Sequence, residues 1–194
     1  MCGSEGMSAS ICRSARVLLA ALSVVCVGGC DLIAPHPAHG TTPPAWQVCF
    51  SPNGGCTRLV VDALDAAKTS VSVQAYSFTS TPIAAALIKA HRRGVRVAVL
   101  LDKSQRTEHD SLGWYLADAG VPVRIDAVHA IAHNKVMILD GEAVLTGSFN
   151  FTRAAETRNA ENLLLLRDRT LAERYQANWD AHAAHAEPFT RPRR

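Results

Sequence analysis

Apolar residues recur in two different patterns between Leu59 and Ala186. In one they return every three or four positions, as Leu59, Val60 and Leu64 do, which is typical of an amphipathic helix. In the other, short runs are apolar at alternate positions (71–76) or at nearly every position (95–101), as in strands covered on one or both faces. These patterns predict helices at 59–64, 81–94, 112–119 and 171–186, and strands at 71–76, 95–101, 121–125, 136–139, 143–145 and 163–166.

The order of these elements predicts an α/β fold, in which a mixed β-sheet is flanked by helices on both faces. The chain has 194 residues and 48% hydrophobic content, which is enough for the core of one domain. We expect that domain to span residues 46–189. Residues 31–45 are rich in proline and read as a flexible linker, and residues 190–194 form a short basic tail.

One pair of apolar runs has the spacing of a β-hairpin. Residues 136–139 and 143–145 are of strand length, and Asp140-Gly141 between them favours the positive φ angles of a type I′ turn. A loop of two residues fixes the register of the two strands. Continued beyond the strands, that register places His133 opposite Ser148.

Four polar side chains converge at the open end of this predicted hairpin. His133 and Lys135 are two residues apart and share a face, and Ser148 and Asn150 share the same face on the partner strand. An ammonium group neutralises phosphate oxygens, a hydroxyl and an amide hydrogen-bond them, and an imidazole attacks phosphorus or transfers protons near neutral pH. The pattern therefore predicts a site for a phosphodiester.

The spacing H-x-K-x4-D-x6-G-S-x-N, from His133 to Asn150, resembles the HKD signature of the phospholipase D superfamily. Glu161 stands where relatives carry a glutamate beside the histidine. The resemblance covers roughly residues 46–189. Among the branches of the superfamily, the chain most resembles the periplasmic non-specific endonucleases of bacteria, which carry one motif and are small, exported and homodimeric. It implies a phospholipase D/nuclease-like fold and a metal-independent phosphodiesterase.

The two carboxylates of this pattern, Glu161 and Asp140, are expected to have different roles. Glu161 begins an apolar strand, where a carboxylate needs a partner. We expect it to accept a hydrogen bond from His133 and to hold that ring in one tautomer, with an exposed strand-end position as the alternative. Asp140 lies at the hairpin turn, far along the strand from His133, so a supporting structural role is at least as well founded as a chemical one.

Cleavage through a covalent intermediate needs a nucleophile and a separate proton donor. The chain has one H-x-K motif, so the resemblance implies a homodimer in which His133 of one subunit attacks phosphorus and His133 of the other protonates the leaving alcohol. His91, His109 and His129 are the alternatives within the chain. The lysine, serine and asparagine of the site would stabilise the developing charge, so we expect neither a metal ion nor a cofactor.

The substrate is less strongly indicated than the chemistry. The formal charge is +3, and residues 31–194 hold 18 basic and 16 acidic residues, so binding to nucleic acid would rely on a local patch. Basic residues that flank the site favour DNA, or else RNA, and two aromatic residues either stack bases or cap the core. The alternatives are a phospholipase D acting on phosphatidyl lipids and a non-catalytic protein that binds nucleic acid or the envelope. The flanking residues are Lys103, Arg106, Arg153 and Arg158, and the aromatic pair is Tyr76 and Phe78.

Residues 1–30 read as an export signal. Arg13 and Arg16 precede an apolar run of eleven residues (17–27), which is too short to span a bilayer. The run ends in Val-Gly-Gly-Cys, which resembles a bacterial lipobox with Cys30 as the lipidated residue; a plain secretory signal is the alternative. We therefore expect an exported, periplasmic protein, held on a membrane surface if Cys30 is lipidated.

Two cysteines remain in the predicted domain, Cys49 and Cys56. An oxidising compartment would pair them in a disulfide that closes a short loop. A zinc site is the alternative, although no second cysteine pair lies nearby.

Overall fold

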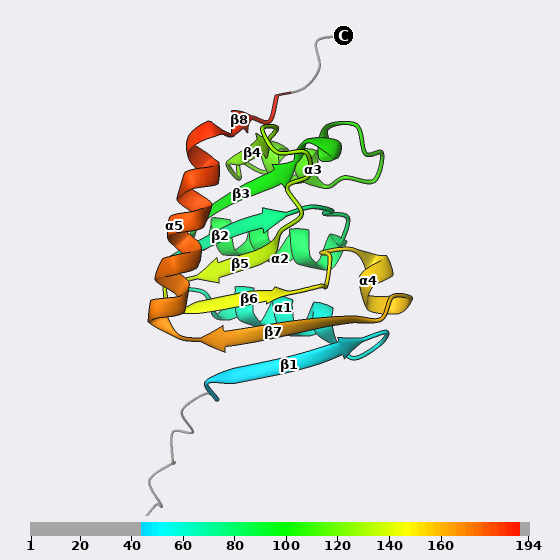
Figure 1. Ribbon diagram of the computed structural model, residues 1–194, viewed down its shortest axis with the longest axis vertical. Coiled ribbons are helices and arrows are strands. Elements are labelled where there is room, and N and C mark those ends of the chain that lie inside the picture. The colour runs from blue at the N-terminus through cyan, green and yellow to red at the C-terminus, as the bar shows by residue number, and fades with distance from the viewer. Residues whose placement is uncertain (1–43, 191–194) are drawn as a thin grey trace, which may run out of the picture. The chain divides into compact units, whose positions relative to one another are not determined.

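The computed structural model describes residues 44–190, which form a single mixed sheet of eight strands in the order β1-β7-β6-β5-β2-β3-β4-β8 (Figure 1). The predicted export signal, the lipidation site at Cys30, most of the linker and the end of the basic tail lie outside the described residues. The strands are β1 (Trp46–Ser51), β2 (Ser70–Ala75), β3 (Arg96–Asp102), β4 (Val123–Asp126), β5 (Lys135–Leu139), β6 (Ala143–Gly147), β7 (Glu161–Arg167) and β8 (Glu187–Pro188). The helices are α1 (Cys56–Ala66), α2 (Thr81–Arg92), α3 (Gly113–Asp118), α4 (Arg153–Thr157) and α5 (Arg169–His185), with a 3-10 turn, η1, at Lys103–Arg106.

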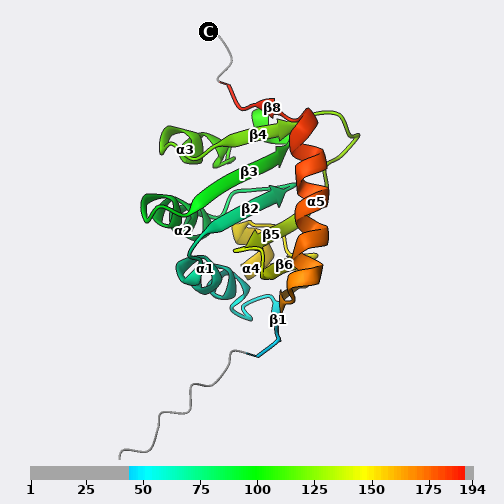
Figure 2. The same cartoon turned by 90° about the vertical axis from the view of Figure 1, so that its left-hand side faces the viewer.

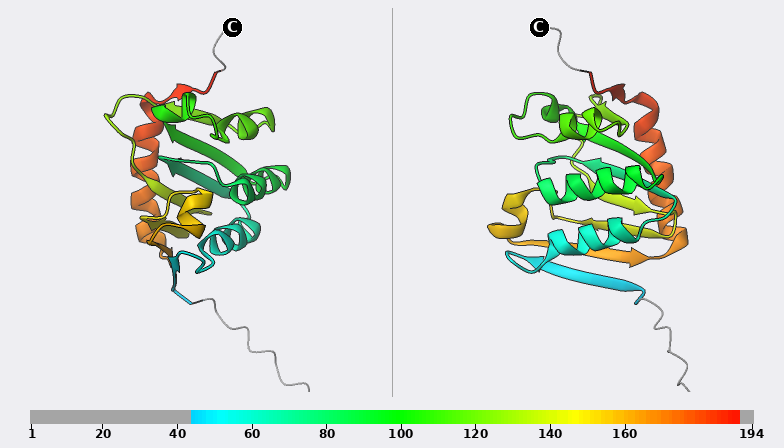
Figure 3. Two further views of the ribbon diagram at one scale, coloured as in Figure 1. Left: turned by 90° about the vertical axis from the view of Figure 1, so that its right-hand side faces the viewer. Right: turned by 180° about the vertical axis from the view of Figure 1, so that it is seen from behind.

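Helices cover both faces of the sheet, as predicted. Figure 2 shows α1, α2 and α3 on one side and α5 alone on the other, and the view from behind in Figure 3 shows α1 and α2 in front of the sheet, roughly aligned with the strands. The large core lies under α1 and α2, which bury Val60 and Leu64 of α1 and Ile83 and Leu87 of α2, while α5 packs on a smaller cluster. Trp179 of α5 donates from Nε1 to the carbonyl of Val73 at 2.9 Å, which ties α5 to β2. Within residues 44–190, no helix has the length and hydrophobicity needed to cross a membrane.

The sheet is parallel in its middle and antiparallel around it. Strands β2, β3 and β4 run parallel, and β5, β6, β7 and β1 follow as antiparallel neighbours on one side of β2. Parallel neighbours require crossover connections, which α2 and α3 supply, whereas β5 and β6 are joined by a tight turn. The mixed sheet with helices on both faces is confirmed.

The predicted turn forms, but the predicted register of the hairpin is wrong by one residue. Asp140 and Gly141 have φ angles of 55° and 68°, and the amide of Glu142 donates to the carbonyl of Leu139 at 2.9 Å, so the two-residue turn is present. Leu139 nevertheless pairs with Ala143, because Glu142 is inserted as an extra residue after the turn. Burial explains the shift: it places Leu145 in the large core and Val144 under α5.

Strand β1 was not predicted as a strand. It is an edge strand that pairs antiparallel with β7. Its large apolar residues, Trp46, Val48 and Phe50, lie on the exposed face, whereas such residues usually lie on the buried face. The Sγ atoms of Cys49 and Cys56 are joined in a disulfide, with a Cα–Cα distance of 5.5 Å. The bond ties this edge strand to the first residue of α1.

Candidate active site

A polar pocket lies at the end of the sheet where β5 and β7 begin and β6 ends, the end beside α4 in Figures 1 and 3. Its volume is about 400 Å³. The residues predicted to handle a phosphodiester all line it, and Asp140 does not. The lining residues are His133, Lys135, Gly147, Ser148, Asn150 and Glu161.

These side chains converge even though the predicted register is wrong, because most of them lie just outside the regular strands. His133 precedes β5, and Ser148 and Asn150 follow β6, so strict alternation does not set their directions. The amides of Ser148 and Phe149 both donate to the carbonyl of Asn162, at 3.1 and 3.2 Å, as at a β-bulge. The chain thereby turns into the pocket at the point where β6 ends.

Gly147 allows β6 and β7 to approach closely at this bulge. A Cβ atom at position 147 would lie 2.3 Å from the carbonyl oxygen of Asn162 and 3.0 Å from the Cα of Leu163. Both contacts are with backbone atoms, which cannot rotate away. The glycine of the G-S-x-N sequence is therefore required by packing beside the site.

Lys135 is a buried cation. Its exposed fraction is 7%, its Nζ donates to the carbonyl of His133 at 2.7 Å, and Nζ lies 5.0 Å from the centre of the Tyr76 ring. Burial lowers the pKa of Lys135, and the negative charge of Glu161 only partly opposes that shift. Among residues 44–190, no carboxylate lies within ion-pair distance of this ammonium group. The pocket thus presents a positive charge that an anionic ligand would neutralise.

The ring of Tyr76 packs beside the imidazole of His133. Their ring centres are 4.5 Å apart with an interplanar angle of 57°, and the amide of Tyr76 donates to the carbonyl of Asn134 at 2.9 Å. From the sequence, Tyr76 and Phe78 could either stack on bases or cap the core. Phe78 belongs to the core, fully buried against Phe151, whereas Tyr76 borders the site. The sequence signal for this placement was a tyrosine one residue beyond the end of a buried parallel strand.

The carboxylate of Glu161 does not form the expected hydrogen bond with His133. Its Oε1 accepts a hydrogen bond from the side chain of Asn159 at 3.0 Å, and no hydrogen bond joins Glu161 to His133 within the described part of the chain. Glu161 still lines the pocket and acts on Lys135 through its charge.

The two neutral polar residues are placed to contact a ligand. The Oγ of Ser148 accepts hydrogen bonds from the amide and side chain of Asn162, at 3.1 and 3.4 Å, which leaves its own O–H group available as a donor. The Oδ1 of Asn150 is buried and has no hydrogen-bond partner among residues 44–190. A buried polar atom without a partner is uncommon and is explained most simply by a ligand or water that it would bind.

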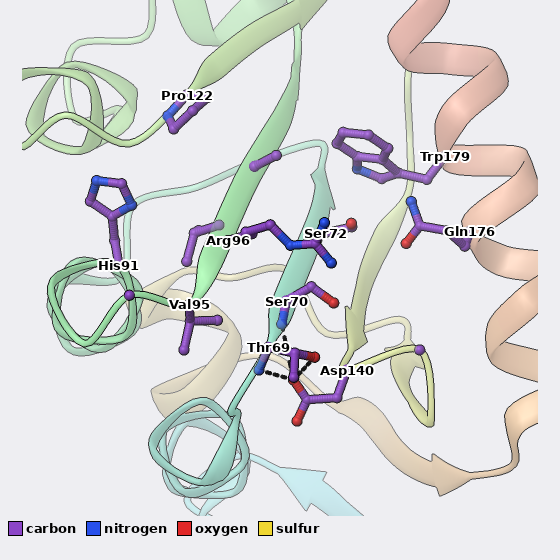
Figure 4. Close-up of a pocket in the computed structure, with 14 residues that line it drawn as sticks. Thr69, Ser70, Ser72, His91, Val95, Arg96, Pro122, Asp140, Gln176 and Trp179 are labelled. Carbon is purple, nitrogen blue, oxygen red and sulfur yellow. Dashed lines mark hydrogen bonds between the residues drawn. The ribbon is translucent and has the colours of Figure 1, made fainter.

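Asp140 lies at the opposite end of β5 and has a structural role. Its carboxylate accepts hydrogen bonds from the amides of Lys68, Thr69 and Ser70 and from the Thr69 hydroxyl, at 2.7 to 3.1 Å. Figure 4 shows Asp140 beside Thr69 and Ser70. Burial raises the pKa of Asp140, but these hydrogen bonds outweigh burial and hold it below its ordinary value. The larger cavity drawn in Figure 4, about 750 Å³, includes Asp140 and none of the residues that line the polar pocket.

None of the alternative histidines lines the polar pocket. His91 lies in α2 beside the larger cavity, His109 is exposed and paired with Asp110, and His129 contacts Asp126. Two of the flanking cations are also engaged elsewhere: Lys103 donates to the carbonyl of His129, and Arg106 forms an ion pair with Glu187. Arg153 and Arg158, at the two ends of α4, are exposed and line a separate pocket together with Asp110.

Residues 60–183 match the family model described as cardiolipin synthase, PLD-like domain. A phospholipase D of Rickettsia typhi is 48% identical over 138 residues, covering 71% of this chain and 68% of the relative. A phospholipase D of Rickettsia bellii is 42% identical over 164 residues, covering 78% and 82%. The mitochondrial cardiolipin hydrolase of Xenopus laevis is 36% identical over 134 residues, covering 69% of this chain and 63% of that protein.

The fold agrees with these matches. The crystal structure of Nuc from Salmonella typhimurium, described as a phospholipase D family member, has 41% sequence identity and a TM-score of 0.71, covering 74% of this chain and 96% of that one. NucT from Helicobacter pylori shares the fold, with a TM-score of 0.66 at 22% identity, covering 74% and 99%. A mixed sheet with a histidine, a lysine, a serine and an asparagine grouped at the ends of neighbouring strands is the arrangement of a phosphodiesterase of the HKD type. The chain belongs to the phospholipase D superfamily, within which it is similar to the Nuc structure.

Proposed function

We propose that this protein is a metal-independent endonuclease that cleaves DNA, or else RNA, through a phosphohistidine intermediate. The observation that carries the proposal is the buried ammonium of Lys135, which has no carboxylate partner among residues 44–190 and lies next to His133 in a pocket that the hydroxyl of Ser148 and the amide of Asn150 also line. Such a pocket is costly to maintain unless a ligand supplies the missing negative charge. A phosphodiester supplies it together with hydrogen-bond acceptors.

In the first step, the imidazole of His133 attacks phosphorus, the bond from phosphorus to the leaving oxygen breaks, and that oxygen receives a proton from a second histidine. In the second step, water attacks the phosphohistidine, gives up a proton to the second histidine and restores His133. Lys135, Ser148 and Asn150 stabilise the negative charge that develops on the phosphoryl oxygens. Glu161 supports the cationic state of the site through its charge on Lys135.

The second histidine is proposed to be His133 of another copy of the chain. Among residues 44–190, no other histidine lines the pocket. Two apolar side chains just before His133 are exposed to solvent, Val128 at 68% and Ile131 at 56%, and a subunit interface would cover them. Both observations favour a homodimer with two copies of the site facing each other.

Mixing experiments would test this shared site. Wild-type protein and His133→Ala are mixed in varying proportions at constant total protein, under conditions that allow subunit exchange. If each site needs two copies of His133, activity should fall as the square of the wild-type fraction. A linear fall would show that one chain is sufficient and would contradict the dimeric mechanism.

DNA is favoured as substrate by the exposed cations of α4, Arg153 and Arg158, and by the similarity to Nuc. A second candidate is hydrolysis of phosphatidyl lipids, favoured by relatives named phospholipase D and mitochondrial cardiolipin hydrolase. The chemistry is the same for both. We also propose that the protein is exported and lipidated at Cys30. The Cys49–Cys56 disulfide supports an oxidising compartment.

The deciding experiment incubates the protein with plasmid DNA, RNA and phosphatidylglycerol vesicles in excess EDTA. Circular dichroism in the same buffer verifies that the protein stays folded. We expect nicking of plasmid by the wild type and by His109→Ala, an exposed-histidine control, and loss of cleavage in His133→Ala. Release of head group without nicking would favour the phospholipase, while binding of DNA that survives His133→Ala with no cleavage by the wild type would favour a non-catalytic role.

A further inference from the structure

A buried carboxylate is surrounded by three imidazoles at the end of α5, outside the polar pocket. Asp126, the last residue of β4, has no exposed side-chain surface. Its oxygens lie 2.6 Å from Nδ1 of His182, 3.2 Å from Nε2 of His185, and 3.1 and 3.2 Å from Nδ1 of His129. Burial opposes ionisation of Asp126, but hydrogen bonds from His182 and His129 outweigh it and lower its pKa to about 2.

The fold holds the four groups from two directions. His182 and His185 are three residues apart in α5, so they project from one face of the helix. His129 lies in the segment between β4 and β5, where Lys103 fixes its carbonyl with a hydrogen bond of 2.9 Å. The end of α5 is itself fastened to β4, because Nε of Arg124 donates to the carbonyl of Ala186 at 3.1 Å and β8 pairs with β4.

We propose that Asp126, His129, His182 and His185 bind one divalent transition-metal ion, with Zn²⁺ as the best match. Each residue offers one ligand atom, and these atoms lie within 4.8 Å of one another. Ligands at about 2.0–2.1 Å in a tetrahedron are separated by roughly 3.3 Å, which is near the observed separation of Asp126 from His129 and His185. Binding would replace the direct hydrogen bonds to Asp126 with bonds from the same ligand atoms to the ion.

The ligand set also indicates what the ion does. Three nitrogens and one carboxylate oxygen fill a tetrahedral site, and a filled site is typical of structural zinc. The side chains of His129 and His185 are 43% and 34% exposed, so the ion has a route from solvent. The ion would fasten the end of α5 to the segment that leads from β4 into His133, and none of its ligands lines the polar pocket. This inference does not depend on the proposed endonuclease function.

Metal binding by the full chain, produced without a polyhistidine tag, tests the proposal directly. After removal of metals with chelator and dialysis, the protein is titrated with ZnCl₂ alone and followed by calorimetry, elemental analysis and thermal unfolding. We expect one Zn²⁺ per chain and a melting temperature that rises until one equivalent is bound. Because loss of an outer-shell partner alone typically weakens metal binding about 10- to 100-fold, His182→Ala and His185→Ala should each weaken it more than about 100-fold.

Two controls keep the result specific. His109→Ala removes a solvent-exposed histidine outside the cluster, and His133→Ala removes the histidine of the polar pocket; both should bind Zn²⁺ as the wild type does. If the α5 variants do not fold, Co²⁺ bound to the wild type should still give the intense visible absorption of tetrahedral coordination. The absence of stoichiometric Zn²⁺ binding by folded wild type, or equal binding by folded His182→Ala, would overturn the proposal and leave the cluster as a hydrogen-bonded network around Asp126.

Discussion

The two ends of strand β5 hold a lysine and an aspartate of the same sequence motif, and they differ in how their charges are satisfied. At one end, the buried ammonium of Lys135 has a single carbonyl as hydrogen-bond acceptor and no ion-pair partner within residues 44–190. At the other end, the carboxylate of Asp140 accepts hydrogen bonds from three amides and a hydroxyl. A charge that the fold leaves unsatisfied is available to a ligand, whereas a satisfied charge stabilises the fold.

The largest effect is expected at the unsatisfied end. Lys135→Met should lower cleavage activity by about 10²–10³-fold, because the site loses the charge that stabilises the phosphoryl oxygens. The same change removes a buried cation, so the melting temperature should stay the same or rise. Activity and thermal unfolding measured on one preparation check both parts.

An exposed lysine provides the control for this pair of measurements. Lys68→Met should leave both activity and melting temperature near those of the wild type, because the Lys68 side chain lies at the surface. A Lys135→Met protein that unfolds at a lower temperature and keeps its activity would mean that Lys135 serves the fold, and the contrast between the two ends of β5 would be lost.

Gly147, the last residue of β6 at the end of the sheet that holds Lys135, should give a smaller effect that combines stability and activity. A methyl group at this position overlaps the carbonyl of Asn162, so β6 and β7 must separate where Ser148 enters the pocket. Gly147→Ala should therefore lower the free energy of unfolding by about 1–3 kcal/mol, the range of an overpacked site. Denaturant unfolding measures the loss.

Thr146→Ala is the matched control, since it changes the neighbouring residue of the same strand without adding volume. It should cost less stability than Gly147→Ala and leave activity nearly unchanged. Equal stability of the Gly147→Ala and wild-type proteins would show that β7 can move away freely, and that the close approach does not hold the pocket together.

The sequence predicted the helices and strands that carry their own periodicity, and it predicted the convergence of His133, Lys135, Ser148 and Asn150. The register was wrong because Glu142 is inserted after a turn that is otherwise as expected, and only burial of Leu145 and Val144 decides that shift. Strand β1 was missed because its exposed positions are apolar, which reverses the usual pattern.

The cluster around Asp126 could not be predicted from the sequence, for a different reason. His182 and His185 lie 56 and 59 residues from Asp126, and they meet it only because α5 returns across the sheet to β4. The sequence does carry a local signal, since Asp126 and His129, like His182 and His185, are three residues apart. Such a spacing indicates a shared site only after the fold has brought the two pairs together.

The smallest effect is expected at the satisfied end of β5. Asp140→Asn should lower the free energy of unfolding by roughly 1–2 kcal/mol, because charged hydrogen bonds from three amides become neutral or are lost, and cleavage activity should change only a few-fold. The pKa of Asp140 is lower in the folded protein than its ordinary value of 3.8, so its carboxylate stabilises the fold fully above that pH. The stability difference between wild type and Asp140→Asn should thus be constant near neutral pH and shrink as the pH falls below about 3.8 through the folded-state pKa. Urea unfolding at several pH values measures this difference. A large loss of activity in Asp140→Asn, with the fold intact, would mean that this carboxylate acts on the site from the far end of β5. A hydrogen-bonded charge in this motif could then no longer be assigned to the fold alone.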